Sequence, residues 1–182
     1  NVDHALITEP EKSSHASILL VASDRGLAGA YSSSVIKETE RLIERLRDEG
    51  KQEISLYVSG RKAESYFKFR NRVIVKTWAG HSDQPNFDVA REMADTLIEA
   101  FVAEEGQHEH ATHEVHVVYT RFKSMLVQEP VALRLLPLEV VEDDAPPAPE
   151  DVLPLYEFEP SAAEVLDSLL PKYKKRFSSI IL

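Results

Sequence analysis

The sequence predicts an α/β fold with three layers, α/β/α, built on a five-stranded, mostly parallel, Rossmann-like sheet with one antiparallel edge strand. Short apolar runs alternate along the chain with stretches in which apolar residues recur at the three- and four-residue spacing of a helix face. Strands that alternate with helices form parallel sheets covered on both faces. The gap between Phe122 and Val131 is too short for a crossover helix, which predicts that the last strand is antiparallel to its neighbour.

The individual elements follow from local patterns. Ile18 to Ser23 is an apolar run that ends in a turn, which predicts a strand buried on both faces. Ser34 to Glu49 carries an apolar stripe from Val35 to Leu46 and ends at Gly50, as a helix does. The further elements are predicted as strands at Glu53–Ser59, Arg72–Ala79, Glu114–Phe122 and Val131–Val141, and as helices at Arg61–Phe69 and Asn86–Glu105.

Two details concern the sheet edge and a helix start. Pro137 cannot donate a ladder hydrogen bond, which favours an edge position for the last strand. Lys123 to Pro130 is predicted as a turn or short crossing before that strand. Asn86 is predicted as the N-cap of the helix that follows it.

Changes in composition divide the chain. Residues 1–17 are predicted as a polar lead-in segment and residues 18–141 as the α/β domain. Residues 142–152, EDDAPPAPEDV, are acidic and rich in proline, as linkers are. Residues 153–173 contain the capping box Ser161 to Glu164 and are predicted as a helix that caps the same domain. Residues 174–182 are interpreted as the start of a further helix or a tail.

Composition excludes several classes of function. The net charge of −10 disfavours nucleic acid as a partner. The absence of cysteine excludes a disulfide scaffold, a thiolate metal site and a cysteine nucleophile. No apolar run approaches the ~20 residues of a membrane-spanning helix, so we expect no direct membrane insertion. The polar N-terminus, which begins at Asn1, shows no signal peptide, and the chain is interpreted as part of something longer or as processed.

The turn after the first strand is the main candidate for a small-molecule site. Gly26 and Gly29 lie three residues apart, followed by Ser32 to Ser34 at the start of a helix. The glycines match neither the dinucleotide fingerprint nor the P-loop, because the intervening glycine and the lysine are missing. We therefore interpret Asp24, Arg25, Gly26 and Gly29 as a structural turn that lets the helix pack tightly, with no cofactor.

Two chemical alternatives remain open. Asp24 stands at the carboxyl end of a strand, where open α/β sheets place ligands, and an aspartate there can be a phosphate-handling nucleophile. The alternative is that Asp24 caps the turn and pairs with a basic residue. The stretch QHEHATHEVH, which contains His108, His110, His113 and His116, resembles a metal site only in composition, since its spacing matches no helical or loop motif. We favour a solvated loop and predict no metal site.

Three segments resemble the gamma subunit of the F-type (rotary) ATP synthase, in the same order and with matching separations. They are SDRGLAGAY at Ser23–Tyr31, YTRFKSMLVQEPVALRLLPL at Tyr119–Leu138 and LYEFEPSAAEVLDSLLPKY at Leu155–Tyr173. The closing KKRFSSIIL departs from the family pattern, and Gly106 to His113 resembles a lineage-variable insertion. With no cysteine, the chain lacks the thiol switch of the chloroplast version.

The resemblance implies a mechanical role for the chain. Gamma subunits of this family combine a long coiled coil with a globular α/β domain, and this chain resembles only the globular domain. The resemblance implies a non-catalytic central-stalk (rotor) subunit without a cofactor, which couples rotation of the membrane rotor c-ring to ATP synthesis. The implied partners are the epsilon subunit, the c-ring and, through the missing coiled coil, the alpha/beta catalytic hexamer. The implied location is peripheral, on the cytoplasmic face of the cell membrane.

The resemblance also suggests an interface. Tyr156, Glu157 and Phe158 are the residues expected near the ring and the epsilon subunit; the alternative is that they pack on the sheet edge. Two other functions remain as rival hypotheses, a free-standing small-molecule-binding module and a phosphohydrolase centred on Asp24.

Overall fold

The computed structural model describes residues 13–25, 31–81, 86–104, 106–124 and 126–138. These residues contain a five-stranded sheet in the order β3-β2-β1-β4-β5. Its strands are β1 (His15–Val21), β2 (Glu53–Ser59), β3 (Lys76–Trp78), β4 (Glu114–Ser124) and β5 (Val127–Leu136). The first four strands are parallel, and β5 lies antiparallel to β4 at the edge. The predicted sheet, including its antiparallel edge strand, is therefore confirmed.

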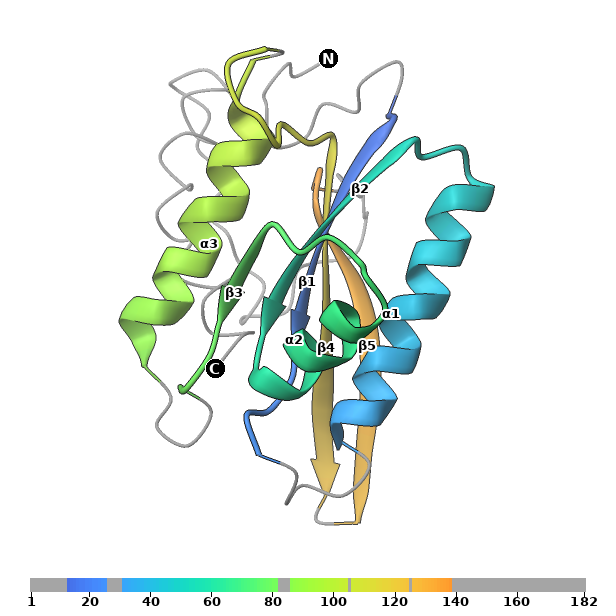
Figure 1. The fold of residues 1–182 in the computed structure, drawn as a ribbon, viewed down its shortest axis with the longest axis vertical. Coiled ribbons are helices and arrows are strands. Elements are labelled where there is room, and N and C mark those ends of the chain that lie inside the picture. Colours follow the sequence, from blue (N-terminus) through green and yellow to red (C-terminus); the bar gives the residue numbers. More distant parts are fainter. Residues whose placement is uncertain (1–12, 26–30, 82–85, 105, 125, 139–182) are drawn as a thin grey trace, which may run out of the picture.

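Helices cover both faces of the sheet (Figure 1). One face packs against α1 (Tyr31–Asp48) and α2 (Arg61–Phe69), and the other packs against α3 (Phe87–Val102). Successive residues of β1 point to opposite sides, so that Leu20 joins the core under α1 while Leu19 joins the core under α3. Both side chains are fully buried, which explains why the run from Ile18 to Val21 is apolar without alternation.

The long helix α1 buries its predicted face, and α3 begins at its predicted cap. The buried residues of α1 are the predicted stripe: Val35, Ile36, Thr39, Leu42, Ile43 and Leu46. Thr39 is tolerated there because its hydroxyl donates to the carbonyl of Val35 at 2.8 Å. Asn86 is confirmed as the N-cap of α3, since its side-chain oxygen accepts from the Asp88 N–H at 2.8 Å.

Several element boundaries differ from the prediction. α1 begins at Tyr31, before Ser34, and α3 ends at Val102, before Glu105. β1 begins at His15, because its first residues pair in register with the start of β2.

β3 occupies only Lys76–Trp78 of the predicted Arg72–Ala79 strand. The preceding residues form the loop that leaves α2, in which the Arg72 N–H donates to the carbonyl of Phe67 at 3.0 Å.

The prediction for Lys123 to Pro130 was wrong. β4 continues to Ser124, and β5 already begins at Val127. The hydroxyl of Ser124 accepts from the N–H groups of Leu126 and Val127, at 3.3 and 3.2 Å, which closes the hairpin without a glycine. Pro130 lies inside β5 opposite Thr120, a position that an edge strand tolerates. Pro137 follows β5, so the predicted end at Val141 was also too late.

Candidate functional site

The carboxyl ends of β1, β2 and β3 are joined by backbone hydrogen bonds. The Ala22 N–H donates to the carbonyl of Ser59, and the Gly60 N–H donates to the carbonyl of Trp78, both at 2.8 Å. Open α/β sheets place ligands beyond this edge. In this chain, the link from β2 to α2 lies at these carboxyl ends, directly against the end of β1.

Gly60 makes this close approach possible. Its φ of +106° lies in the region that side-chain-bearing residues rarely adopt. A Cβ added to Gly60 would lie 2.5 Å from the carbonyl oxygen of Ala22. The backbone of Ala22 and Ser23, directly after β1, therefore occupies the space that a side chain at position 60 would need.

Asp24 is the N-terminal cap of α2, supplied from 37 positions earlier in the chain. The local N-cap residue is Gly60, which has no side chain to offer. The Arg61 N–H instead donates to Oδ1 of Asp24 at 3.0 Å, and the Lys62 N–H donates to the carbonyl of Ser23 at 3.3 Å. The carboxylate also lies at the positive end of the helix dipole. The alternative predicted for Asp24 was a cap of its own turn paired with a basic residue; this contact is instead with the backbone N–H of Arg61 in α2.

The serines of the turn bond to one another. The hydroxyls of Ser23 and Ser32 are 2.8 Å apart, and the Ser23 hydroxyl donates to the carbonyl of Arg25 at 2.9 Å. The hydroxyl oxygen of Ser32 also accepts from the Ser23 N–H at 3.4 Å, which connects the start of α1 to the segment that follows β1. Gly26 and Gly29 lie outside the described residues, as do the candidate interface residues Tyr156, Glu157 and Phe158.

The histidines of the predicted loop contact the backbone. Nδ1 of His113 accepts from the N–H groups of Ser14 and His15, at 3.1 and 3.3 Å. Nδ1 of His108 accepts from the His110 N–H at 3.0 Å. In the part of the chain that the structure describes, no group of three His, Asp or Glu side chains converges as metal ligands would.

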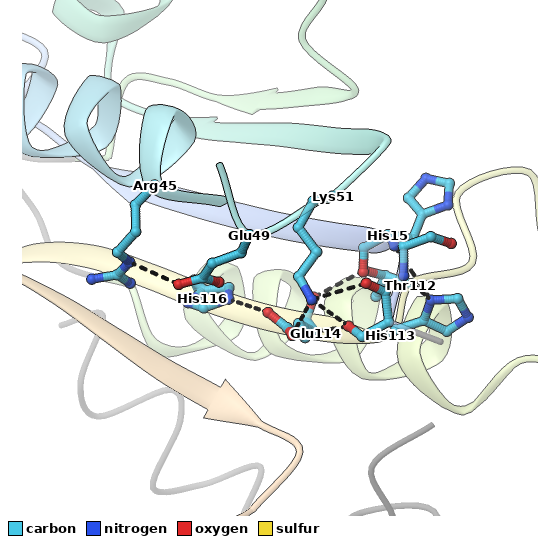
Figure 2. Close-up of polar contacts among 10 residues, drawn as sticks. His15, Arg45, Glu49, Lys51, Thr112, His113, Glu114 and His116 are labelled. Atoms are coloured by element: carbon cyan, nitrogen blue, oxygen red, sulfur yellow. Dashed lines mark hydrogen bonds and ion pairs between the residues drawn. The ribbon is translucent and has the colours of Figure 1, made fainter. Parts of the chain in front are cut away.

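A buried polar cluster was missed by sequence reasoning (Figure 2). Its centre is Glu114, at the start of β4. Oε1 of Glu114 lies 2.7 Å from Nζ of Lys51, and Oε2 lies 2.9 Å from Nε2 of His116. The Ser13 hydroxyl donates to Oε1 at 2.9 Å. Lys51 also donates to the carbonyl and the hydroxyl of Ser13, at 2.9 and 2.8 Å.

This cluster joins segments that are distant in the sequence. Ser13 precedes β1, Lys51 lies between α1 and β2, and Glu114 and His116 belong to β4. Thr112 adds to it, because its hydroxyl donates to the carbonyls of Glu114 and His15, at 2.9 and 3.3 Å. The contacts lie at the amino ends of the parallel strands, opposite the edge that Asp24 closes. Sequence reasoning missed the cluster because Ser13, Lys51 and Glu114 are 38 or more residues apart in the chain.

The hydrogen bonds of the cluster determine the ionisation of Glu114. Burial alone would raise the pKa of this carboxyl. The hydrogen bonds from His116, Lys51 and Ser13, together with the charge of Lys51, outweigh burial and lower the pKa to about 2. Glu114 is therefore ionised at neutral pH, and its contacts are those of a structural ion pair.

The described residues thus define an α/β domain in which backbone hydrogen bonds join the carboxyl ends of β1, β2 and β3. A buried ion pair lies at the amino ends of the parallel strands. A family model described as ATP synthase matches residues 1–177. The chain is 65% identical over 173 residues to a protein of Nocardioides sp. named ATP synthase gamma chain, covering 95% of this chain and 56% of that one. The protein of the same name from Arthrobacter sp. is 55% identical over 174 residues, covering 94% and 57%. The chain belongs to the ATP synthase gamma-chain family.

Solved structures agree with this fold. A chain from the central stalk and c-ring of the Tetrahymena thermophila mitochondrial ATP synthase aligns with a TM-score of 0.62 at 18% identity, covering 94% of this chain and 68% of that one. A chain from the rotor of the Euglena gracilis mitochondrial ATP synthase aligns with a TM-score of 0.58 at 14% identity, covering 97% and 65%. The resemblance to the gamma subunit predicted from the sequence is confirmed.

The match is to part of the relatives. The chain spans somewhat more than half the length of the curated gamma chains that it resembles. Among the described helices, none combines the length and the apolar character needed to cross a membrane.

Proposed function

We propose that this chain is the globular part of a central-stalk subunit of the F-type ATP synthase. In this role it transmits rotation between the membrane rotor ring and the catalytic hexamer and has no reaction centre of its own. The observation that carries the proposal is the 65% identity, over 173 residues, to a protein named ATP synthase gamma chain.

The geometry supports a mechanical role for two reasons. A part that transmits torque must resist shear between its strands. The carboxyl edge is held where Gly60 lies against Ala22 and Asp24 caps α2, and the amino edge is held by the pair of Lys51 and Glu114. Both connections join segments far apart in the chain, so neither opens by unwinding one element.

The proposed partners follow from the same role. They are the rotor c-ring and the epsilon subunit at the base of the stalk, and the alpha/beta hexamer through the coiled coil that gamma subunits of this family carry. Tyr156, Glu157 and Phe158 are proposed to contact the ring or the epsilon subunit. The chain would then be a peripheral component on the cytoplasmic face of the cell membrane.

A chimaera tests the proposal. The matching 173-residue stretch of the Nocardioides gamma chain is exchanged for this chain, and the purified complex is assayed for ATP-driven rotation and proton pumping. We expect assembly and rotation close to those of the parent enzyme. A complex that assembles but neither rotates nor pumps contradicts the proposal. Ligand-dependent thermal stabilisation of the 182-residue chain would instead support a small-molecule-binding module.

A further inference from the structure

An open hollow of about 600 Å³ lies between α1 and the loop that joins α2 to β3. It is lined by Glu40, Arg47, Arg70, Asn71, Arg72 and Val73. Three arginines and one glutamate give this lining a net charge of +2, on a chain whose net charge is −10. The lining of the hollow is therefore positively charged, whereas the chain as a whole is negatively charged.

Two of the three guanidinium groups are available to a ligand. Arg72 lies 3.3 Å from the carboxylate of Glu40, which holds it in place. Arg47 and Arg70 form no ion pair within the described residues, and both side chains belong to exposed residues. A guanidinium is a planar fork of donors that matches a carboxylate with two parallel hydrogen bonds.

The loop that carries these arginines is held by its own contacts. Asn71 adopts φ 55°, and its N–H donates to the carbonyl of Lys68 at 3.0 Å. The guanidinium of Arg70 lies over the ring of Tyr66, 4.7 Å from its centroid. A ligand would therefore meet donors whose positions are already restricted, which lowers the entropic cost of binding.

Large apolar side chains project beside the arginines. Phe69 is 89% exposed and Val73, which lines the hollow, is 82% exposed. Phe69 is the last residue of α2 and Val73 lies in the loop that follows, and exposing both side chains to water has a hydrophobic cost that folding does not require. Aromatic residues and arginine are enriched in the central parts of protein–protein interfaces, relative to the rest of the protein surface.

We propose that this hollow is a docking site for an acidic segment of a partner protein that also carries an aromatic or aliphatic side chain. Carboxylates of the segment bind Arg47 and Arg70, and its apolar side chain packs against Phe69 and Val73. A nucleic acid or an anionic membrane would be repelled by the negative charge of the rest of the chain. The inference rests on the proposed function in one respect: the partner is expected to be another subunit of the complex to which this chain belongs.

Photo-crosslinking in the chimaeric complex tests the inference. A photoreactive amino acid replaces Val73, and the adduct is identified by mass spectrometry. We expect one adduct, to a segment of another subunit with several carboxylates and an aromatic or aliphatic residue among them. The substitutions Arg47→Ser and Arg70→Ser together should lower the adduct yield by about tenfold, because two charge-assisted contacts are removed.

The control is Arg41→Ser with Arg45→Ser, which removes the same total charge as the test variant. Both control residues lie on α1, and neither lines the hollow. It should leave the yield within about twofold. The inference is overturned by no adduct, by an adduct to lipid or to residues 142–159 of the same chain, or by equal losses in both double variants. Rotation of the parent chimaera is measured separately. The crosslinking result then tests the docking site, and the rotation result tests the proposed function.

Discussion

Nζ of Lys51 lies 2.7 Å from Oε1 of Glu114, with only 8% and 11% of the two side chains exposed. This pair connects the end of α1 to the start of β4 across the sheet. A buried charge whose partner is removed keeps its desolvation cost without compensation. The pair therefore matters for stability mainly through what happens when one member is lost.

Removing the lysine should be strongly destabilising. We expect Lys51→Met to lower the free energy of unfolding by about 3–5 kcal/mol, because Glu114 then stays buried without its cation. Urea unfolding followed by circular dichroism measures the change. The double variant Lys51→Met with Glu114→Leu should lose less than the sum of the single losses. A loss below about 1 kcal/mol in Lys51→Met would show that water replaces the ion pair at little cost.

The lowered pKa of Glu114 predicts that the free energy of unfolding decreases at acidic pH. The folded pKa of Glu114, about 2, lies below its ordinary value of 4.5, so its contribution is complete above pH 4.5. It is lost as the pH falls from 4.5 toward 2, by roughly 2–3 kcal/mol. Urea unfolding at intervals between pH 6 and pH 3 should follow this decline. Glu114→Gln should flatten this part of the curve; an unchanged curve would assign the acid sensitivity to other carboxyls.

The elements predicted most accurately are those whose signals are local. β2 and α2 occupy the predicted residues Glu53–Ser59 and Arg61–Phe69, because Gly60 separates two short, clear patterns. The β4–β5 hairpin was misplaced because Ser124 closes it with its side chain, whereas the prediction assigned all of Lys123 to Pro130 to the turn. Proline in an edge strand is permitted, so it did not mark a boundary.

The candidate site was only partly predictable. A capping role for Asp24 was among the alternatives, but its partner Arg61 lies in an element that only the folded chain brings near. His116 was grouped with a histidine-rich loop, whereas it is buried beside Glu114 on β4. Such contacts depend on strand order and register, which composition and spacing do not contain.

Gly60 and Gly50 provide a matched test of the close approach at the carboxyl edge. Both have positive φ, of +106° and +94°, but only Gly60 has atoms within 4 Å of an added Cβ. We expect Gly50→Ala to cost about 1 kcal/mol, from backbone strain alone. Gly60→Ala should cost about 2–4 kcal/mol, because the methyl group collides with the carbonyl of Ala22. Equal losses in thermal unfolding would mean that β1 moves aside freely.

Substitutions of Asp24 distinguish two roles for its carboxylate, as a cap of α2 or as a catalytic group. Asp24→Ala should lower stability by about 1 kcal/mol, because the Arg61 N–H loses its acceptor, whereas Asp24→Asn should cost only a few tenths. Asp48→Ala, at the last residue of a different helix, α1, is the control and should be close to neutral. In a phosphohydrolase, Asp24→Asn would abolish turnover while preserving the fold. Phosphatase assays on the wild-type chain and on this variant therefore decide between the two roles.

The proposed partner interface is tested by assembly. In the chimaeric complex, Tyr156→Ala with Glu157→Ala should weaken retention of the epsilon subunit or the rotor ring by about tenfold, because an aromatic and a charged contact are lost together. The thermal unfolding of the 182-residue chain should change by little. Glu142→Ala with Asp143→Ala, in the stretch predicted as a linker, is the control and should leave retention unchanged. If the Tyr156 variant assembles normally but unfolds at lower temperature, these residues pack on the sheet edge and the interface lies elsewhere.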